Sequence, residues 1–173
     1  MPDPESLKSA KAHALRYLSY RERSKWELSQ YLEKKEHSHP VIQQTLNYLI
    51  ELNYVNDQRF AVQWGQYKIN KNKLGRNRLY LELLGKGIDK ETIEGTLNTL
   101  YEDNPEMELA AQCARKKWIT LEGVEEEKKK RRLVQYLQRR GFSSDIIYQS
   151  LRTVSESADI ENHMMPSSTL DQD

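Results

Sequence analysis

A segment of this chain occurs three times, and five apolar positions keep the same register in each copy. The first copy has Leu28, Leu32, Ile42, Leu46 and Leu49. The equivalent positions of the other two copies are Leu79, Leu83, Ile93, Leu97 and Leu100, and then Leu133, Leu137, Ile147, Leu151 and Val154. Because these positions follow helical spacing, each copy predicts two amphipathic helices joined by a short turn.

An opening helix before each copy completes a three-helix repeat. The sequence therefore predicts an all-α fold of three tandem three-helix, helix-turn-helix-like repeats that form an elongated, curved array. We expect the repeats at residues 1–54, 55–104 and 105–154, followed by a disordered acidic tail at 155–173. Arrays of this kind present an extended surface to a long partner and rarely enclose a catalytic pocket.

Capping residues support this register. Ser24-Lys25-Trp26-Glu27 has the form of a capping box, in which the Ser24 hydroxyl accepts from the helix and Glu27 reaches back to the cap. Ser38, Asp89 and Ser143 fall at equivalent places before the last helix of each repeat. The turn before that last helix contains glycine in the second and third repeats, whereas the first repeat has Lys35-Glu36-His37.

Aromatic residues are expected in the cores. Phe60, Trp64 and Tyr67 follow helical spacing, which predicts an apolar stripe on the opening helix of the second repeat. For the three tryptophans, Trp26, Trp64 and Trp118, we expect a core role rather than a stacking role.

Basic residues gather at the same place in each repeat, although 27 Lys and Arg nearly balance 26 Asp and Glu. One basic block is ordinarily a solvated helix face, but three in register favour contact with a polyanion or an acidic protein. The candidate binding residues are Arg21, Arg23, Lys25, Lys68, Lys71, Lys73, Arg76, Arg78, Lys128, Lys129, Lys130, Arg131, Arg132, Arg139 and Arg140.

Three of these cations, Lys25, Arg76 and Lys130, are predicted to lie in the first turn of the second helix of each repeat. A helix start carries partial positive charge and free backbone amides, so a cation there is favourable only when an anion arrives. The hypothesis is that these helix starts meet DNA phosphates or carboxylates of a partner. The alternative is local neutralisation by Glu27 and Glu82.

Catalytic chemistry finds no support in the sequence. The histidines His13, His37, His39 and His163 lack metal-ligand spacing, and Cys113 lies in a helical pattern typical of a buried thiol. We therefore expect no enzyme activity, no cofactor and no metal. The chain has no apolar run long enough to span a membrane and no secretion signal at its start, so we expect a cytoplasmic protein.

Several motifs resemble the RecX family of regulatory proteins. They are Tyr20-Arg21-Glu22-Arg23-Ser24, Tyr54-Val55-Asn56-Asp57, Leu74-Gly75-Arg76, Lys86-Gly87-Ile88-Asp89 and Arg139-Arg140-Gly141-Phe142, and their order and spacing also match over most of residues 8–154. The resemblance implies a bacterial, cytoplasmic, monomeric regulator in DNA repair, homologous recombination and the SOS response. It would bind the RecA filament on single-stranded DNA, inhibit the recombinase, ATPase and coprotease activities of RecA, and bind DNA directly only weakly.

Two other functions stay open. Helix-turn-helix repeats can bind DNA autonomously, without RecA, through their last helix. In this chain, however, the basic residues lie mostly one helix earlier, which favours contact with a backbone or a protein over base reading. A structural adaptor for another acidic protein is the second alternative.

Overall fold

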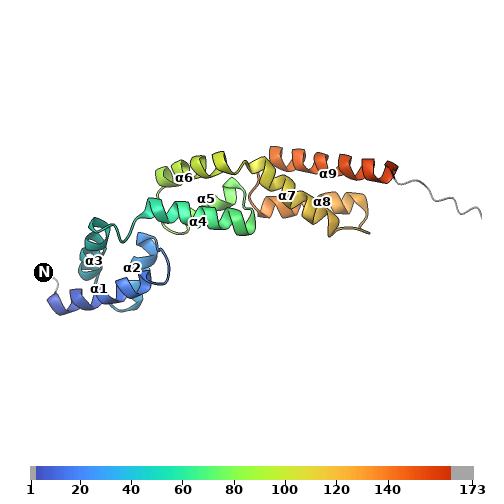
Figure 1. Ribbon diagram of the computed structural model, residues 1–173. Helices are drawn as coiled ribbons and strands as arrows, with labels where there is room; N and C mark the ends of the chain where they lie inside the picture. Colours follow the sequence, from blue (N-terminus) through green and yellow to red (C-terminus); the bar gives the residue numbers. More distant parts are fainter. Residues whose placement is uncertain (1–2, 165–173) are drawn as a thin grey trace, which may run out of the picture. The chain divides into compact units, whose positions relative to one another are not determined.

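The computed structural model describes residues 3–164, which form nine α-helices (Figure 1). Their bounds are α1 Pro4–Leu18, α2 Lys25–Lys34, α3 His39–Glu51, α4 Asp57–Asn72, α5 Arg76–Leu84, α6 Lys90–Asp103, α7 Glu106–Ile119, α8 Glu126–Arg139 and α9 Ser144–Met164. The predicted all-α class is confirmed. None of these nine helices combines the length and the apolar character that crossing a bilayer requires.

The chain divides into two compact units. Unit 1 comprises Met1–Lys71 and Leu79–Asp103, and unit 2 comprises Asn72–Arg78 and Asn104–Asp173. The division falls within the second repeat, because the residues at the start of α5 belong with the third repeat. The predicted repeat boundaries therefore stay a prediction, although the three-helix pattern itself is present.

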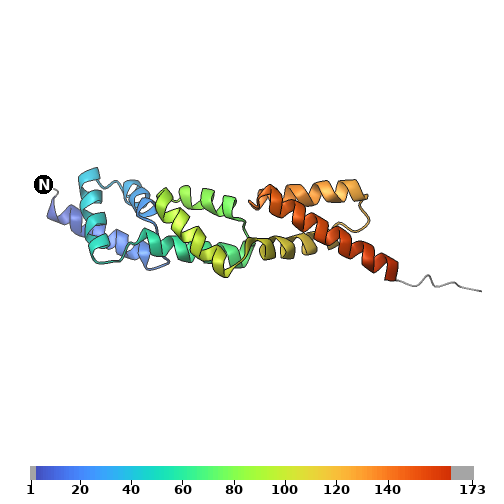
Figure 2. The same ribbon diagram turned by 90° about the horizontal axis from the view of Figure 1, so that it is seen from above.

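Unit 1 has a core in each of its two parts. Helices α1, α2 and α3 pack on one another around a continuous apolar cluster (Figure 2). The cluster consists of Ala10, Ala14, Leu28, Leu32, Val41, Ile42, Leu46, Leu49 and Val55. In the second part, Gly65 of α4 lets the helix approach its neighbours closely, since a Cβ atom there would lie 2.4 Å from Leu100 Cδ1.

Unit 2 is built on helices α7, α8 and α9, which contact one another pairwise and run side by side in both views (Figures 1 and 2). Its buried residues include Leu109, Cys113, Leu133, Leu137 and Ile147. The prediction that Cys113 is a buried thiol is confirmed, and burial raises the pKa of its thiol. A raised thiol pKa keeps little thiolate at neutral pH, which fits a packing role.

The repeated apolar positions form the cores as predicted. Fourteen of the fifteen are buried and only Leu151 is half-buried. Burying such side chains contributes about 1.5–3 kcal/mol each relative to exposure. The apolar positions that repeat in the sequence are therefore the positions that pack in the cores.

Two of the four predicted caps form a side-chain bond to their helix. The Ser24 hydroxyl accepts from the Glu27 amide at 3.1 Å, and Asp89 accepts from the Thr92 amide at 2.9 Å. Ser38 precedes α3 but makes no side-chain cap bond. The capping box is only half formed, because two cations bind the Glu27 carboxylate and hold it away from the Ser24 amide.

Helix α9 corrects the predicted tail. We expected disorder from residue 155, whereas α9 continues to Met164. Arg152 and Glu156 form an i,i+4 ion pair at 2.7 Å, and the Ser155 and Ser157 hydroxyls bond to carbonyls one turn earlier, at Leu151 and Thr153. These local bonds satisfy polar side chains within the helix. Residues 165–173 of the predicted tail lie outside the described residues.

The core role predicted for the tryptophans is wrong for Trp26. Its side chain is 47% exposed, although its Cβ packs against Gly87. Trp64 and Trp118 are half-buried, and Lys129 Nζ lies 4.2 Å from the ring centroid of Trp118. Helical spacing can predict the side of its own helix on which each ring lies. It cannot predict how much of the ring is buried by other helices.

Candidate functional site

The start of helix α2 is bound by residues of the second repeat. The Asp57 carboxylate accepts from the Lys25 backbone amide at 2.7 Å, and the Ser24 hydroxyl donates to the Lys86 carbonyl at 2.7 Å. Gly87, with a φ of +74°, lies against Trp26, where a Cβ atom would come within 2.4 Å of the Trp26 Cβ. We call this contact the first junction.

The start of helix α5 is bound in the same way by the third repeat, within unit 2. The Glu106 carboxylate accepts from the Arg76 amide at 2.9 Å, and the Gly75 amide donates to the Arg140 carbonyl at 2.7 Å. Gly141, with a φ of +87°, approaches the backbone of Arg78. This contact is the second junction, and its parts correspond to those of the first.

The junctions correct the hypothesis that the helix starts are free for external anions. Carboxylates of the following repeat, Asp57 and Glu106, already accept from the amides of Lys25 and Arg76. Burial raises the pKa of both carboxyls, and the bonds from the helix amides oppose that rise. The favourable anion at a helix start is therefore internal.

Lys130 corrects the predicted equivalence of the three cations. It is the fifth residue of α8, because that helix begins at Glu126, four residues earlier than we expected. Glu126 and Glu127 in the first turn complement the helix dipole, and Lys130 forms an i,i+4 ion pair with Glu126.

Two of the predicted binding residues in unit 1, Arg21 and Lys68, take part in internal ion pairs. Arg21 binds Glu27 through both terminal nitrogens, at 3.1 and 3.0 Å, and Lys86 binds the same carboxylate at 2.7 Å. Lys68 pairs with Glu82 at 2.8 Å. Lys86 and Glu27 lie 59 residues apart in the sequence, so charge counting could not reveal their pairing. Arg21 and Lys68 are less available to a partner than the sequence implied.

Glu27 makes the first junction sensitive to acid. Burial pushes its pKa up, but hydrogen bonds and charges of Arg21 and Lys86 outweigh burial and lower it. The folded-state pKa of Glu27 lies below its ordinary value of 4.5. The ionised carboxylate therefore stabilises the folded chain fully above pH 4.5, and this stabilisation disappears as the pH falls through the folded-state pKa.

We expect Glu27→Gln to lower the free energy of unfolding by about 1–2 kcal/mol at pH 7, discounted for the partial exposure of Arg21. The deficit should shrink as the pH falls below 4.5 and through the lowered folded-state pKa, because wild-type Glu27 then also becomes neutral. Urea unfolding of both proteins from pH 3 to pH 7 measures it. A deficit independent of pH would show that lost packing, rather than charge, is responsible.

The most exposed basic surface lies on helix α8. Lys128, Arg131, Arg132 and Arg139 are exposed and fall on one side of the helix, opposite the buried Leu133 and Leu137. We call these four residues the α8 basic face. Only Lys128 has an ion pair among those found in the described part of the chain, with Glu125 at 3.2 Å, and both partners are exposed.

Other predicted residues of unit 2 lie at the second junction. Lys73, Arg76 and Arg78 belong to the segment at the start of α5, and Arg140 lies at the end of α8. Arg140 also lies over Tyr136, 4.7 Å from the ring centroid. Lys73, Arg76, Arg78 and Arg140 therefore all belong to unit 2.

The remaining predicted residues are separate from one another. The Arg23 guanidinium lies over Tyr17 at 4.0 Å, and Lys71 bonds to the Tyr67 hydroxyl at 2.8 Å. Lys25 has an exposed side chain, and only its backbone amide takes part in the junction. The sequence analysis missed Lys86, although its place before Gly87 at a repeat turn was a usable signal.

The fold and the charges define an all-α tandem-repeat protein. Its neighbouring repeats are joined by the two junctions, and helix α8 has an exposed basic face. Three family models match in order: RecX first three-helix domain over residues 10–49, second over 56–97 and third over 104–151. The chain belongs to the RecX family.

Relatives and solved structures agree with this assignment. Regulatory protein RecX of Bacillus subtilis (strain 168) is 35% identical over 143 residues, which cover 83% of this chain and 54% of that protein. The RecX protein of Bacillus cytotoxicus is 31% identical over 155 residues, covering 90% and 57%. The crystal structure of RecX from Lactobacillus salivarius matches with a TM-score of 0.77 at 28% identity, covering 87% of this chain and 97% of that one. The chain thus spans somewhat more than half the length of these Bacillus relatives.

Proposed function

We propose that this chain is a non-enzymatic regulator that binds the RecA filament on single-stranded DNA and inhibits the recombinase, ATPase and coprotease activities of RecA. The observation that carries the proposal is the match of all three repeats, in order, to a family whose members are named regulatory proteins. The place of action would be the cytoplasm, where DNA repair and the SOS response use RecA.

The α8 basic face is the part that we assign to the filament. Its side chains are exposed and share one side of a helix, so their charges reinforce one another toward a polyanion. Arg78 and Arg140, at the second junction, extend the same assignment to the neighbouring repeat. Arg21 and Lys68 contribute less, since their ion pairs would have to break first.

Autonomous DNA binding is the second candidate. Base reading would use basic or amide side chains on the last helix of a repeat, and α3, α6 and α9 do expose amides such as Gln43, Asn47 and Gln149. These helices expose few cations, however. The cations lie on α8, a second helix. This distribution favours contact with phosphate or protein over sequence recognition.

ATP hydrolysis by RecA on single-stranded DNA tests the proposal. We expect substoichiometric amounts of this chain to lower the rate, because a regulator bound to a filament affects many RecA subunits. The control is an equal amount of the chain carrying glutamate at Arg131, Arg132 and Arg139, which should inhibit much less. An unchanged ATPase rate, or tighter binding to bare duplex DNA than to filaments, would contradict the proposal and favour the autonomous DNA-binding protein.

A further inference from the structure

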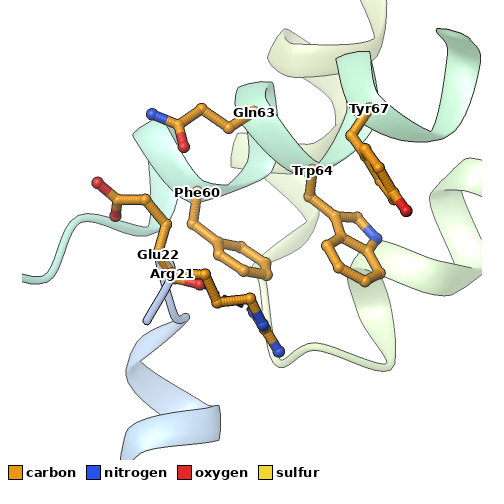
Figure 3. Close-up of a pocket in the computed structure, with 6 residues that line it drawn as sticks. All are labelled: Arg21, Glu22, Phe60, Gln63, Trp64 and Tyr67. Atoms are coloured by element: carbon orange, nitrogen blue, oxygen red, sulfur yellow. Dashed lines mark hydrogen bonds between the residues drawn. The ribbon is translucent and has the colours of Figure 1, made fainter. Parts of the chain in front are cut away.

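An aromatic pocket of about 390 Å³ opens beside helix α4 in unit 1 (Figure 3). It is lined by Arg21, Glu22, Phe60, Gln63, Trp64 and Tyr67. Figure 3 shows Phe60, Trp64 and Tyr67 along the same side of the helix, with the Arg21 side chain passing below Phe60 toward the indole ring. The Phe60 and Trp64 rings are nearly parallel, at an interplanar angle of 14°.

Cations outnumber carboxylates around this pocket. Arg21, Lys68 and Lys86 lie 5.7, 4.9 and 4.8 Å from the Trp64 ring, and Lys71 bonds to the Tyr67 hydroxyl. The neighbouring carboxylates of Glu22, Glu27 and Glu82 are all held by basic side chains, Arg59 among them. The positive surroundings favour a ligand that joins a flat ring to a negative charge.

Two features of the pocket are not explained by core packing. Tyr67 is 49% exposed, although it lies on the predicted core stripe. The Trp64 indole N–H is buried and has no hydrogen-bond partner within residues 3–164, and Figure 3 shows its nitrogen on the side of Tyr67. A buried donor without an acceptor is costly, so a ligand that supplies a carbonyl oxygen when Tyr67 turns aside would regain free energy.

We propose that this pocket binds one unstacked base of single-stranded DNA, with an adjoining phosphate near Lys71. Aromatic rings and a guanidinium plane hold bases by stacking, which tolerates any sequence because every base has a π face. An aromatic side chain of a partner protein would fill the same space, but it brings no phosphate for the surrounding cations. The proposal deepens the proposed function, since single-stranded DNA is the core of the filament.

Binding to two oligonucleotides, without RecA, tests the proposal. One is oligothymidylate and the other is an abasic strand of the same length, which keeps the phosphates but removes the bases. We expect the wild-type chain to prefer oligothymidylate by about 5- to 100-fold, the range that one stacked base contributes. Tyr67→Ala should remove most of this preference and leave the affinity for the abasic strand unchanged. Fluorescence anisotropy of labelled strands measures both affinities.

Two control variants make the result specific. Tyr67→Phe keeps the ring and loses only the bond to Lys71, so it should retain the preference. Tyr148→Ala removes another exposed tyrosine, on α9, and should behave like the wild type.

A Tyr67→Ala variant that keeps the preference for oligothymidylate, or that binds both strands equally more weakly, would overturn the proposal. A variant that loses only its affinity for RecA filaments would identify a protein side chain as the occupant and would also overturn it. Since the comparison of the two oligonucleotides contains no RecA, its failure would leave the ATPase test of the proposed function unaffected.

Discussion

Replacing Arg131, Arg132 and Arg139 by glutamate is expected to weaken binding to single-stranded DNA and to RecA filaments by at least about tenfold at physiological salt. These side chains are exposed on one side of α8, so the change removes three positive charges from one surface and introduces three repelling ones. Glutamate is also a good helix former, and the helix should persist. If each arginine contacts a phosphate, the slope of log affinity against log salt should fall by about 2 in magnitude.

The matched control reverses three exposed lysines away from α8. Lys8, Lys34 and Lys90 are exposed and absent from the candidate binding surface, and their replacement by glutamate changes the net charge by the same amount. We expect this control to retain most of the affinity. Titrations at several salt concentrations compare the two variants. Equal losses in both would mean that only net charge matters, and no loss in the α8 variant would refute the assignment of this face.

Gly141→Ala is expected to lower the free energy of unfolding by about 3 kcal/mol or more. The residue has a φ of +87°, and an added Cβ atom would lie 2.2 Å from the backbone nitrogen of Arg78 and 2.4 Å from its Cβ. The alanine must therefore push the turn at residue 141 away from the start of α5 at the second junction. Loss of that contact would also break the bond from the Gly75 amide to the Arg140 carbonyl. Urea unfolding measures the cost.

Gly123→Ala distinguishes conformational strain from the close approach. Gly123 has a similar φ of +77°, but a Cβ atom there would meet nothing within 4 Å. Its replacement should cost only about 1–2 kcal/mol, the usual penalty of a left-handed residue with a side chain. The difference between the two variants measures what the junction contributes. Equal costs would mean that Gly141 is required for its backbone conformation alone.

The core could be predicted because it depends on local periodicity. Leu28 and Leu32 recur as Leu79 and Leu83, and all four are fully buried. A helical repeat needs only its own helices to define which side is apolar, so the spacing of residues in the chain carries that information. The caps at Ser24 and Asp89 were predictable for the same reason, since each bonds within its own helix start.

The candidate site could be predicted only in part, because the state of a charged side chain depends on distant partners. Glu27 lies 59 residues before Lys86, and neither helix pattern contains that pairing. Likewise, the sequence gives no sign that the Asp57 carboxylate bonds to the start of α2 in the preceding repeat. The exposure of the α8 basic face could be expected from its residue types, because exposed charged side chains need no partner, and its role in binding stays a prediction.

The turn at Glu36 has a consequence for how these repeats can associate. Glu36 takes a φ of 61° at the position that glycine occupies in the later repeats, where the preceding repeat approaches closely. Here a side chain projects instead, and a second molecule could not dock its own helix start on this turn as Trp26 docks on Gly87 or Arg78 on Gly141. We therefore expect that this turn does not join one molecule to the next through the kind of contact that joins repeats within the chain.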